Sequence, residues 1–114
     1  MAYDIHITRA ADWSGSRTQP IRLDEWYSLI ENSPEMRLEE VATATNPTTG
    51  EVIGLDTPGR AVWLSHPRGI AVSFDYRNGK ISVKSPDHES LEKMKQIAAT
   101  FGAHVQGDDG EEYD

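Results

Sequence analysis

The sequence predicts an α+β fold, with a mostly antiparallel, twisted sheet of five to seven strands and two amphipathic helices packed on one of its faces. Three observations lead to this prediction. Two stretches have apolar residues at helical spacing, several short stretches alternate between apolar and polar residues, and turn residues separate most of them. The expected order is strand, helix, five strands, helix and strand, because hairpins in series form an antiparallel sheet that helices can cover.

The first expected elements are a strand and a long loop. Residues 3–8 alternate, with Tyr3, Ile5 and Ile7 apolar and the residues between them polar, which is the period of a half-buried strand. Residues 9–19 have no such period and contain Ser14-Gly15-Ser16. A loop of this length is long enough to carry function.

The first helix is predicted from an apolar stripe at positions i, i+3, i+4 and i+7, formed by Leu23, Trp26, Tyr27 and Ile30. Ile21 and Trp26 have the spacing of a hydrophobic staple around Arg22, which is a poor N-cap residue. The run Asn32-Ser33-Pro34 is expected to end the helix.

The middle of the chain indicates strands joined by turns. The expected turns are at 46–50, between strands over 40–45 and 51–55, then at 57–59, and at 66–69 after a strand over 60–65. A three-residue loop at the last turn would set Leu64 opposite Val72 and Val62 opposite Phe74. That register turns Trp63 away from the core, towards the polar face of the sheet.

The strongest local prediction is a hairpin at Asn78-Gly79, the preferred two-residue type I′ turn. One face of this hairpin is apolar, with the pairs Tyr76–Ile81 and Phe74–Val83. The other face is polar, with the pairs Asp75–Ser82 and Ser73–Lys84.

The second helix is expected to start at Ser85-Pro86, with Ser85 as the N-cap and Pro86 as the first helical residue. Its buried stripe is Leu91, Met94, Ile97, Ala98 and Phe101, and Glu89 and Lys93 form an i,i+4 pair on its wet face. Gly102 is the expected left-handed C-cap, and a short strand over 104–106 follows.

Length and charge predict one domain over residues 1–107 and an acidic, flexible segment over 108–114. The chain has 114 residues and a net charge of −8, of which −5 lies after Gly107. Repulsion from phosphates makes direct binding to nucleic acid or to membranes unfavourable. The chain contains no cysteine, no signal-peptide pattern and no apolar run long enough for a membrane span, which together indicate a cytoplasmic protein without disulfides or zinc–thiolate sites.

The sequence carries no catalytic or metal-binding signature, and it predicts no metal and no cofactor. The four histidines are scattered, although His6 and His104 would approach each other if the terminal strands paired. Residues 108–112 lack the spacing of an EF-hand loop. A Ser-His-Asp triad is recognised by geometry alone, and no spacing in the chain points to one.

Two surfaces are candidates for binding. Trp63, on a polar sheet face beside Asp75, would suit a protein-binding anchor, unless the 9–19 loop folds over with Trp13 and buries it. The acidic side chains of the last residues, Asp108, Asp109, Glu111 and Glu112, either stay in solvent, dock a basic partner, or fold back onto their own domain. The exposed sheet edge or the Trp63 face would also suit a weak homodimer, so both a monomer and a dimer are expected possibilities.

A different possibility is a ligand-binding or enzymatic site between the 9–19 loop and the sheet. Such a site would use Arg9, Trp13, Trp63, Asp75 and His66. A deep pocket with convergent polar groups would favour this function over a flat acidic binding face.

Several motifs together resemble a group of small, uncharacterised acidic bacterial proteins. These motifs are Tyr3-Asp4-Ile5-His6-Ile7-Thr8-Arg9 with Trp13, Pro20-Ile21 before Asp24-Glu25-Trp26, Asn46-Pro47 with Thr49-Gly50-Glu51, Phe74-Asp75-Tyr76-Arg77, and Gly107-Asp108-Asp109-Gly110-Glu111. The resemblance spans nearly the whole chain, and relatives of this kind look similar to immunity proteins. The resemblance implies a protein that binds and neutralises a toxin. Small size, concentrated negative charge and the lack of a catalytic signature likewise predict a non-enzymatic, inhibitor-type protein that binds a basic partner, such as a toxin or a nucleic-acid-binding protein.

Overall fold

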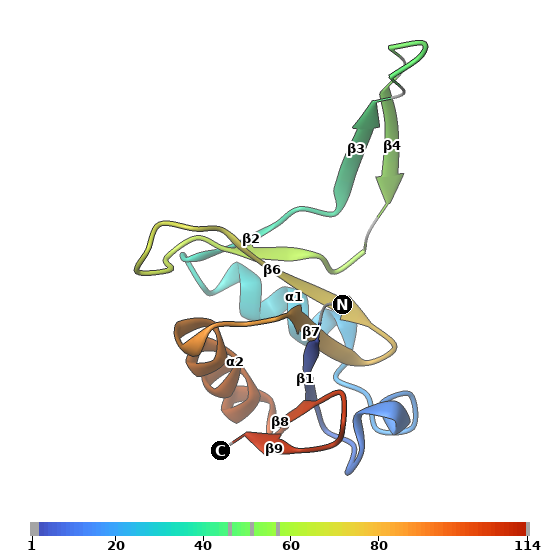
Figure 1. The fold of residues 1–114 in the computed structure, drawn as a ribbon. Coiled ribbons are helices and arrows are strands. Elements are labelled where there is room, and N and C mark those ends of the chain that lie inside the picture. Colours follow the sequence, from blue (N-terminus) through green and yellow to red (C-terminus); the bar gives the residue numbers. More distant parts are fainter. Residues whose placement is uncertain (1–2, 46, 51, 57, 114) are drawn as a thin grey trace.

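The fold is α+β, as predicted, with two α-helices and a seven-stranded antiparallel sheet (Figure 1). The computed structural model describes residues 3–45, 47–50, 52–56 and 58–113, and within 41–45 and 52–56 it describes the backbone. The helices are a 3₁₀ turn η1 (Trp13–Gly15), α1 (Leu23–Glu31) and α2 (His88–Phe101). The strands are β1 (Asp4–Thr8), β2 (Met36–Leu38), β3 (Val41–Thr45), β4 (Val52–Asp56), β5 (Ala61–Trp63), β6 (Val72–Arg77), β7 (Lys80–Lys84), β8 (His104–Gly107) and β9 (Glu112–Tyr113).

The N-terminal strand lies inside the sheet, whose strand order is β2-β5-β6-β7-β1-β8-β9. Strand β1 pairs with β7 on one side, where Ile5 is opposite Val83, and with β8 on the other, where Ile7 is opposite Val105. The chain therefore brings its first strand beside β8, the last strand but one of the described sequence. This arrangement is what allows residues near position 6 to meet residues near position 108.

Strands β3 and β4 form a separate hairpin that stands away from the body of the molecule (Figure 1). They pair with each other from Val41–Asp56 to Thr45–Val52, on either side of the turn predicted at 46–50, of which the structure describes 47–50. Residues 46 and 51 of that turn region, and residue 57 of the next one, lie outside the described residues. The hairpin leaves the main sheet because β2 pairs directly with β5.

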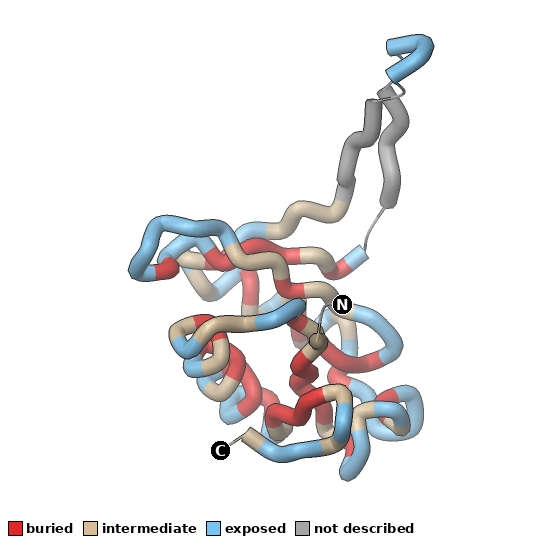
Figure 2. Tube along the Cα trace, in the orientation of Figure 1, coloured by how far each residue is buried: buried red, intermediate tan, exposed pale blue. Residues whose placement is uncertain are grey.

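Both helices cover the apolar face of the sheet, and the core lies between them and the strands (Figure 2). Trp26 of α1 is fully buried, with ring contacts 6.5 Å between centroids to Phe74 of β6 and to Phe101 of α2. Its indole N–H donates to the Gly59 carbonyl at 2.7 Å. The staple residue Ile21 is also fully buried, and the Arg22 N–H donates to the Glu25 carboxylate at 2.9 Å.

The predicted register of β5 against β6 is wrong by one residue. The structure pairs Ala61 with Phe74, Val62 with Ser73 and Trp63 with Val72. Trp63 therefore points into the core, where it is only 8% exposed, and Leu64 is 44% exposed. The turn at 66–69 forms as expected, with Gly69 N–H donating to His66 O at 2.9 Å, but β5 ends at Trp63 and the connection is longer than three residues. A longer loop removes the constraint on register that a tight turn imposes.

The predicted start of the second helix is also wrong. Asp87, and not Ser85, is the N-cap, and its carboxylate accepts the Ser90 N–H at 2.9 Å. Ser85 has a left-handed φ of 44°, a conformation that cannot begin a helix. The Glu89–Lys93 pair is replaced by an ion pair between Lys93 and Glu35. The C-cap Gly102 is left-handed as predicted, with φ of 61°.

The hairpin at Asn78-Gly79 is confirmed. Both turn residues have positive φ, 54° and 80°, as a type I′ turn requires. Asp75 pairs with Ser82 and Tyr76 pairs with Ile81. A side chain at Gly79 would place its Cβ 2.6 Å from the Pro20 Cβ, so the turn packs directly against the chain entering α1.

Residues 108–113 are not a separate tail, because they fold back onto the sheet. Tyr113 is opposite Val105 and Glu112 is opposite Gln106 in the β8–β9 pair. The Asp108 N–H also donates to the Asp4 carbonyl at 3.1 Å. The acidic side chains of this segment are thus brought onto the polar face of the sheet.

Candidate functional site

A row of polar side chains crosses the face of the sheet that the helices leave uncovered. Adjacent strands place Asp75 opposite Ser82, Ser82 opposite His6, His6 opposite Gln106, and Gln106 opposite Glu112. Each of these residues has at least one apolar neighbour along its own strand that lies in the core or packs against it. The alternation of β-strands therefore gathers five polar groups, from five strands, into one line.

His6 is the centre of this row. Its ring is only 3% exposed because the Trp13 indole stacks on it, with ring centroids 4.5 Å apart. His6 Nε2 lies 2.8 Å from Asp108 Oδ1, and His6 Nδ1 lies 2.6 Å from Ser82 Oγ. Because a carboxylate only accepts, Nε2 carries a proton and donates it to Asp108. Burial works to raise the pKa of Asp108, but hydrogen bonds from the Asp4 N–H and from His6 outweigh it and lower the pKa.

The 9–19 loop folds over the polar face and forms one wall of the site. The Asp12 carboxylate accepts the Ser14 N–H at 2.9 Å and so caps η1. Trp13 donates its backbone N–H to Gln106 Oε1 at 2.7 Å and its indole N–H to the Asp108 carbonyl at 3.2 Å. Ser16 Oγ donates to the Asn78 carbonyl at 2.6 Å. These bonds tie the loop to β8 and to the β6–β7 turn.

Between this loop and the sheet lies a groove of about 550 Å³, which we call the polar-face groove. Its floor includes His6, Ser82 and Asp108, and Trp13 stands at its wall. Four bases line it, namely Arg60, Arg77, Lys80 and Lys84. Three acids line it as well, namely Asp4, Asp75 and Asp108. The volume falls in the range of small-molecule sites.

The basic residues of the groove differ from those elsewhere in the chain. Of the 11 lysines and arginines, seven pair with a described carboxylate: Arg9, Arg22, Arg37, Arg60, Arg68, Lys93 and Lys95. In the part of the chain that the structure describes, the four without such a partner are Arg17, Arg77, Lys80 and Lys84. Three of them line the groove, and Arg17 is close enough to Lys80 to influence its pKa.

Lys80 is the most constrained of these bases. It is buried, and its ammonium group lies 5.8 Å from the centre of the Trp13 ring. Burial lowers the pKa of Lys80, and the positive charges of Arg77 and Arg17 lower it further. A cationic group surrounded by cations, in a chain with 19 acidic residues to 11 basic ones, is a local arrangement that an anion would relieve.

The acidic groups at the end of the chain are engaged within the molecule. Glu111 accepts hydrogen bonds from the hydroxyls of Tyr3 and Tyr113, and Glu112 lies 2.5 Å from His104 Nδ1. The other ring nitrogen of His104 lies 2.6 Å from the Ala10 carbonyl, so both nitrogens face acceptors and the ring is held as an imidazolium. Burial alone would lower the pKa of His104, but these two bonds raise it. Asp109 is exposed.

The structure separates the residues that the sequence analysis grouped into one pocket. Trp13 and Asp75 line the polar-face groove, but Trp63 lies in the core on the opposite face, which rules it out as an exposed anchor. The 9–19 loop covers His6 and does not cover Trp63. Arg9 turns away to bind the Glu25 carboxylate at 2.7 Å and the Phe101 carbonyl at 2.8 Å.

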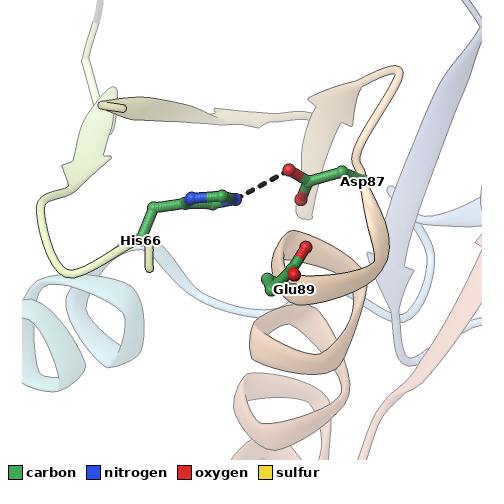
Figure 3. A group of neighbouring side chains, drawn as sticks. All are labelled: His66, Asp87 and Glu89. Atoms are coloured by element: carbon green, nitrogen blue, oxygen red, sulfur yellow. Dashed lines mark hydrogen bonds and ion pairs between the residues drawn. The ribbon is translucent and has the colours of Figure 1, made fainter. Parts of the chain in front are cut away.

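His66 belongs to a separate cluster with Asp87 and Glu89, whose oxygen and nitrogen atoms lie within 4.8 Å of one another (Figure 3). The cluster has the residue types of a metal site. However, His66 Nδ1 accepts the Arg68 N–H at 3.0 Å, so Nε2 carries the ring proton and donates it to Asp87 at 2.7 Å. In a metal-bound histidine, one ring nitrogen directs its lone pair at the metal and the other donates its N–H. Here Nε2, the nitrogen that faces Asp87, carries the proton, so it has no lone pair for a metal. The guanidinium of Arg68 also binds Asp87. The cluster is therefore a clamp between the 64–71 loop and α2.

The residues that sequence reasoning missed are His6, Ser82, Lys80 and Lys84. One signal was present, because Lys80, Ser82 and Lys84 stand two apart and share the polar face of a predicted strand. His6 of β1 and Asp108 could not be placed beside these residues from the sequence, because their contact depends on the order of the strands in the sheet.

Comparison with protein-family models, curated proteins and solved structures finds no match to this chain. None of the described helices is both long enough and apolar enough to cross a membrane.

Proposed function

We propose that the chain binds a small anionic molecule in the polar-face groove. The observation that carries this proposal is the placement of the unpaired bases. Of the four described lysines and arginines without a carboxylate partner, Arg77, Lys80 and Lys84 line one groove of a chain with net charge −8, and the fourth, Arg17, is close enough to Lys80 to lower its pKa. Clustered like charges destabilise a fold, and a bound anion would turn this repulsion into attraction.

The groove also offers the other properties of a ligand site. It has an aromatic wall in Trp13, and its polar groups converge from β1, β6, β7 and the segment after β8. The acids Asp4 and Asp75 lie beside the bases, so the site favours an anion that also carries hydrogen-bond donors. Ammonium groups bind carboxylates and phosphates through charge-assisted hydrogen bonds.

The test is calorimetric titration with citrate and with inorganic pyrophosphate, at low salt. The wild-type protein should bind at least one of them, and Lys80→Gln or Lys84→Gln should each weaken binding by about tenfold, the loss of one charge-assisted hydrogen bond. Lys95→Gln is the matched control, because Lys95 pairs with Glu92 on α2, far from the groove. Absence of binding to both probes, or equal weakening by all three variants, would contradict the proposal.

A second proposal is the inhibitor-type function implied by the sequence resemblance, with a basic protein as partner. It is favoured by the net charge of −8 and by three exposed acids in the last segment, Asp109, Glu111 and Glu112. Acidic surfaces raise association rates with basic partners in a salt-dependent way. Removing the segment would also remove β9, so the better test is Asp109→Asn in a low-salt pull-down. Unchanged capture of a basic protein by this variant would exclude Asp109 as a contact.

A further inference from the structure

Three side chains on the floor of the polar-face groove form one continuous hydrogen-bonded chain. Ser82 Oγ lies 2.6 Å from His6 Nδ1, and His6 Nε2 lies 2.8 Å from Asp108 Oδ1. A hydroxyl, an imidazole and a carboxylate in this sequence are the parts of a nucleophile, its general base and the group that orients the base. His6 and Asp108 are 102 positions apart in the sequence, and the order of strands β7, β1 and β8 brings them and Ser82 together.

The direction of the hydrogen bonds suits proton transfer from Ser82. Because Asp108 accepts from Nε2–H, the proton of a neutral His6 is on Nε2, and Nδ1 presents its lone pair to the serine hydroxyl. Two direct contacts and one indirect contact hold the imidazole in this orientation. Trp13 stacks on its face, Asp108 fixes one nitrogen, and the Asp4 N–H in turn donates to Asp108 Oδ2 at 2.9 Å.

Ser82 is placed where a bound anion would lie. It lines the polar-face groove and is partly exposed, whereas His6 beneath Trp13 is buried. Lys80 and Lys84, two residues before and after it, share its face of β7. Both lysines line the same groove as the hydroxyl, and positive charge near a reacting carbonyl stabilises a developing oxyanion.

We propose that Ser82 is a nucleophile that hydrolyses carboxylic esters bearing a further negative charge, with His6 as general base and Asp108 as a positioning residue. This inference rests on the proposed anion-binding function of the same groove. The lysines bind the anionic group of the substrate, and the ester carbonyl lies over Ser82.

The reaction balances without any further cofactor. Ser82 Oγ forms a bond to the carbonyl carbon as its proton moves to His6 Nδ1. The bond from that carbon to the alcohol oxygen then breaks, and the departing alcohol takes the proton from Nδ1. Water attacks the acyl-Ser82 and gives its proton to Nδ1, and the acid leaves as Ser82 Oγ regains a proton.

If the same three residues only hold the C-terminal segment on β1, the protein forms no covalent product with an ester. The test therefore uses 4-nitrophenyl succinate, an ester with a free carboxylate, and follows nitrophenolate release together with peptide mapping of the protein. The expected result is a burst of nitrophenolate and a succinyl group on Ser82. Neutral 4-nitrophenyl acetate should react more slowly, because it lacks the group that the lysines bind.

Three variants locate the reaction. Ser82→Ala should abolish the burst, and Ser73→Ala should leave it unchanged, since Ser73 is a serine on the neighbouring strand outside the groove. Asp108→Asn should lower kcat at least tenfold with little change in KM, because it disturbs the orientation of His6 and leaves the lysines in place.

The outcomes separate this inference from the binding proposal. Succinyl groups only on lysines, or a burst that survives Ser82→Ala, would overturn the nucleophile while citrate or pyrophosphate binding would still support the groove as an anion site. No acylation together with no binding of either anion would overturn both.

Discussion

Replacing Trp63 and Leu64 one at a time tests the register of β5, on which the assignment of the two sheet faces depends. Trp63 is 8% exposed and packs in the core, opposite Met36 and Val72 on the adjacent strands and with its ring 5.5 Å from that of His66. Leu64 is 44% exposed. The two neighbours should therefore respond very differently to truncation.

The magnitudes follow from burial. Truncating a buried Trp to Ala costs about 3–5 kcal/mol through lost transfer free energy and the cavity left behind, which corresponds to roughly 12–20 °C in Tm for a domain of this size. Leu64→Ala should cost less than about 1 kcal/mol, because nearly half of the side chain is already in water. Urea unfolding followed by circular dichroism measures both.

The register expected from a three-residue loop gives the opposite result, with Leu64 in the core and Trp63 on the polar face. A larger loss of stability for Leu64→Ala than for Trp63→Ala would refute the structural register. If Trp63→Ala does not fold, Trp63→Phe compared with Leu64→Ala keeps the same ordering testable.

Three further predictions concern single residues. The pKa of His104 is raised, so the stability it contributes is present below its ordinary pKa of about 6.5 and is lost as pH rises through the raised value; His104→Gln should flatten this alkaline decline in the urea midpoint. A side chain in the left-handed conformation costs about 1–2 kcal/mol of backbone strain. Gly102→Ala should cost only this strain, because no atom lies within 4 Å of the new Cβ, whereas Gly79→Ala should destabilise the protein by more, because its Cβ would clash with Pro20; urea unfolding measures both. Hydrogen bonds from the Ser90 N–H and hydroxyl, followed by those from Arg68 and His66, hold the pKa of Asp87 below its ordinary value. Stability should therefore fall as pH drops below about 4, and Asp87→Asn should reduce this acid dependence in the same unfolding assay.

Local patterns in the sequence predicted most elements of the fold. The stripe around Trp26 predicted α1, Asn78-Gly79 predicted the β6–β7 hairpin with its register, and Gly102 predicted the end of α2. In each case the decisive interactions lie within a few residues along the chain. The errors arose where the local signal was ambiguous. Ser85 before Pro86 matched a helix start, but the N-cap is Asp87, two residues later, and the turn at Gly69 did not reveal that β5 ends before it.

The site was only partly predictable. A pocket between the 9–19 loop and the sheet was among the expected possibilities, and Trp13 and Asp75 line such a groove. His6 and Asp108 could not be joined from the sequence, because their contact depends on β1 lying between β7 and β8. The acidic character of residues 108–114 predicted a flexible segment, with folding back onto the domain as one alternative, and specific bonds to His6, Tyr3 and His104 hold its described residues on the sheet.

The same bonds show how charge and topology combine in this chain. Acids of the last segment form hydrogen bonds with His6 of β1 and His104 of β8, whereas Arg77, Lys80 and Lys84 of β6 and β7 have no carboxylate partner among the described residues. The polar face is therefore divided into an internally satisfied part and a part with surplus positive charge. Both parts border the polar-face groove, with His6 and Asp108 on its floor and the bases that we propose bind the anion around it.

The most direct test of the account is to map citrate or pyrophosphate, whichever binds more tightly in calorimetry, onto the protein by NMR chemical-shift perturbation. We predict that the largest shifts fall on the Trp13 indole and on the backbone amides of residues 80–84 and 108. Shifts concentrated on the 64–71 loop or on α2, or spread evenly over the surface, would contradict it.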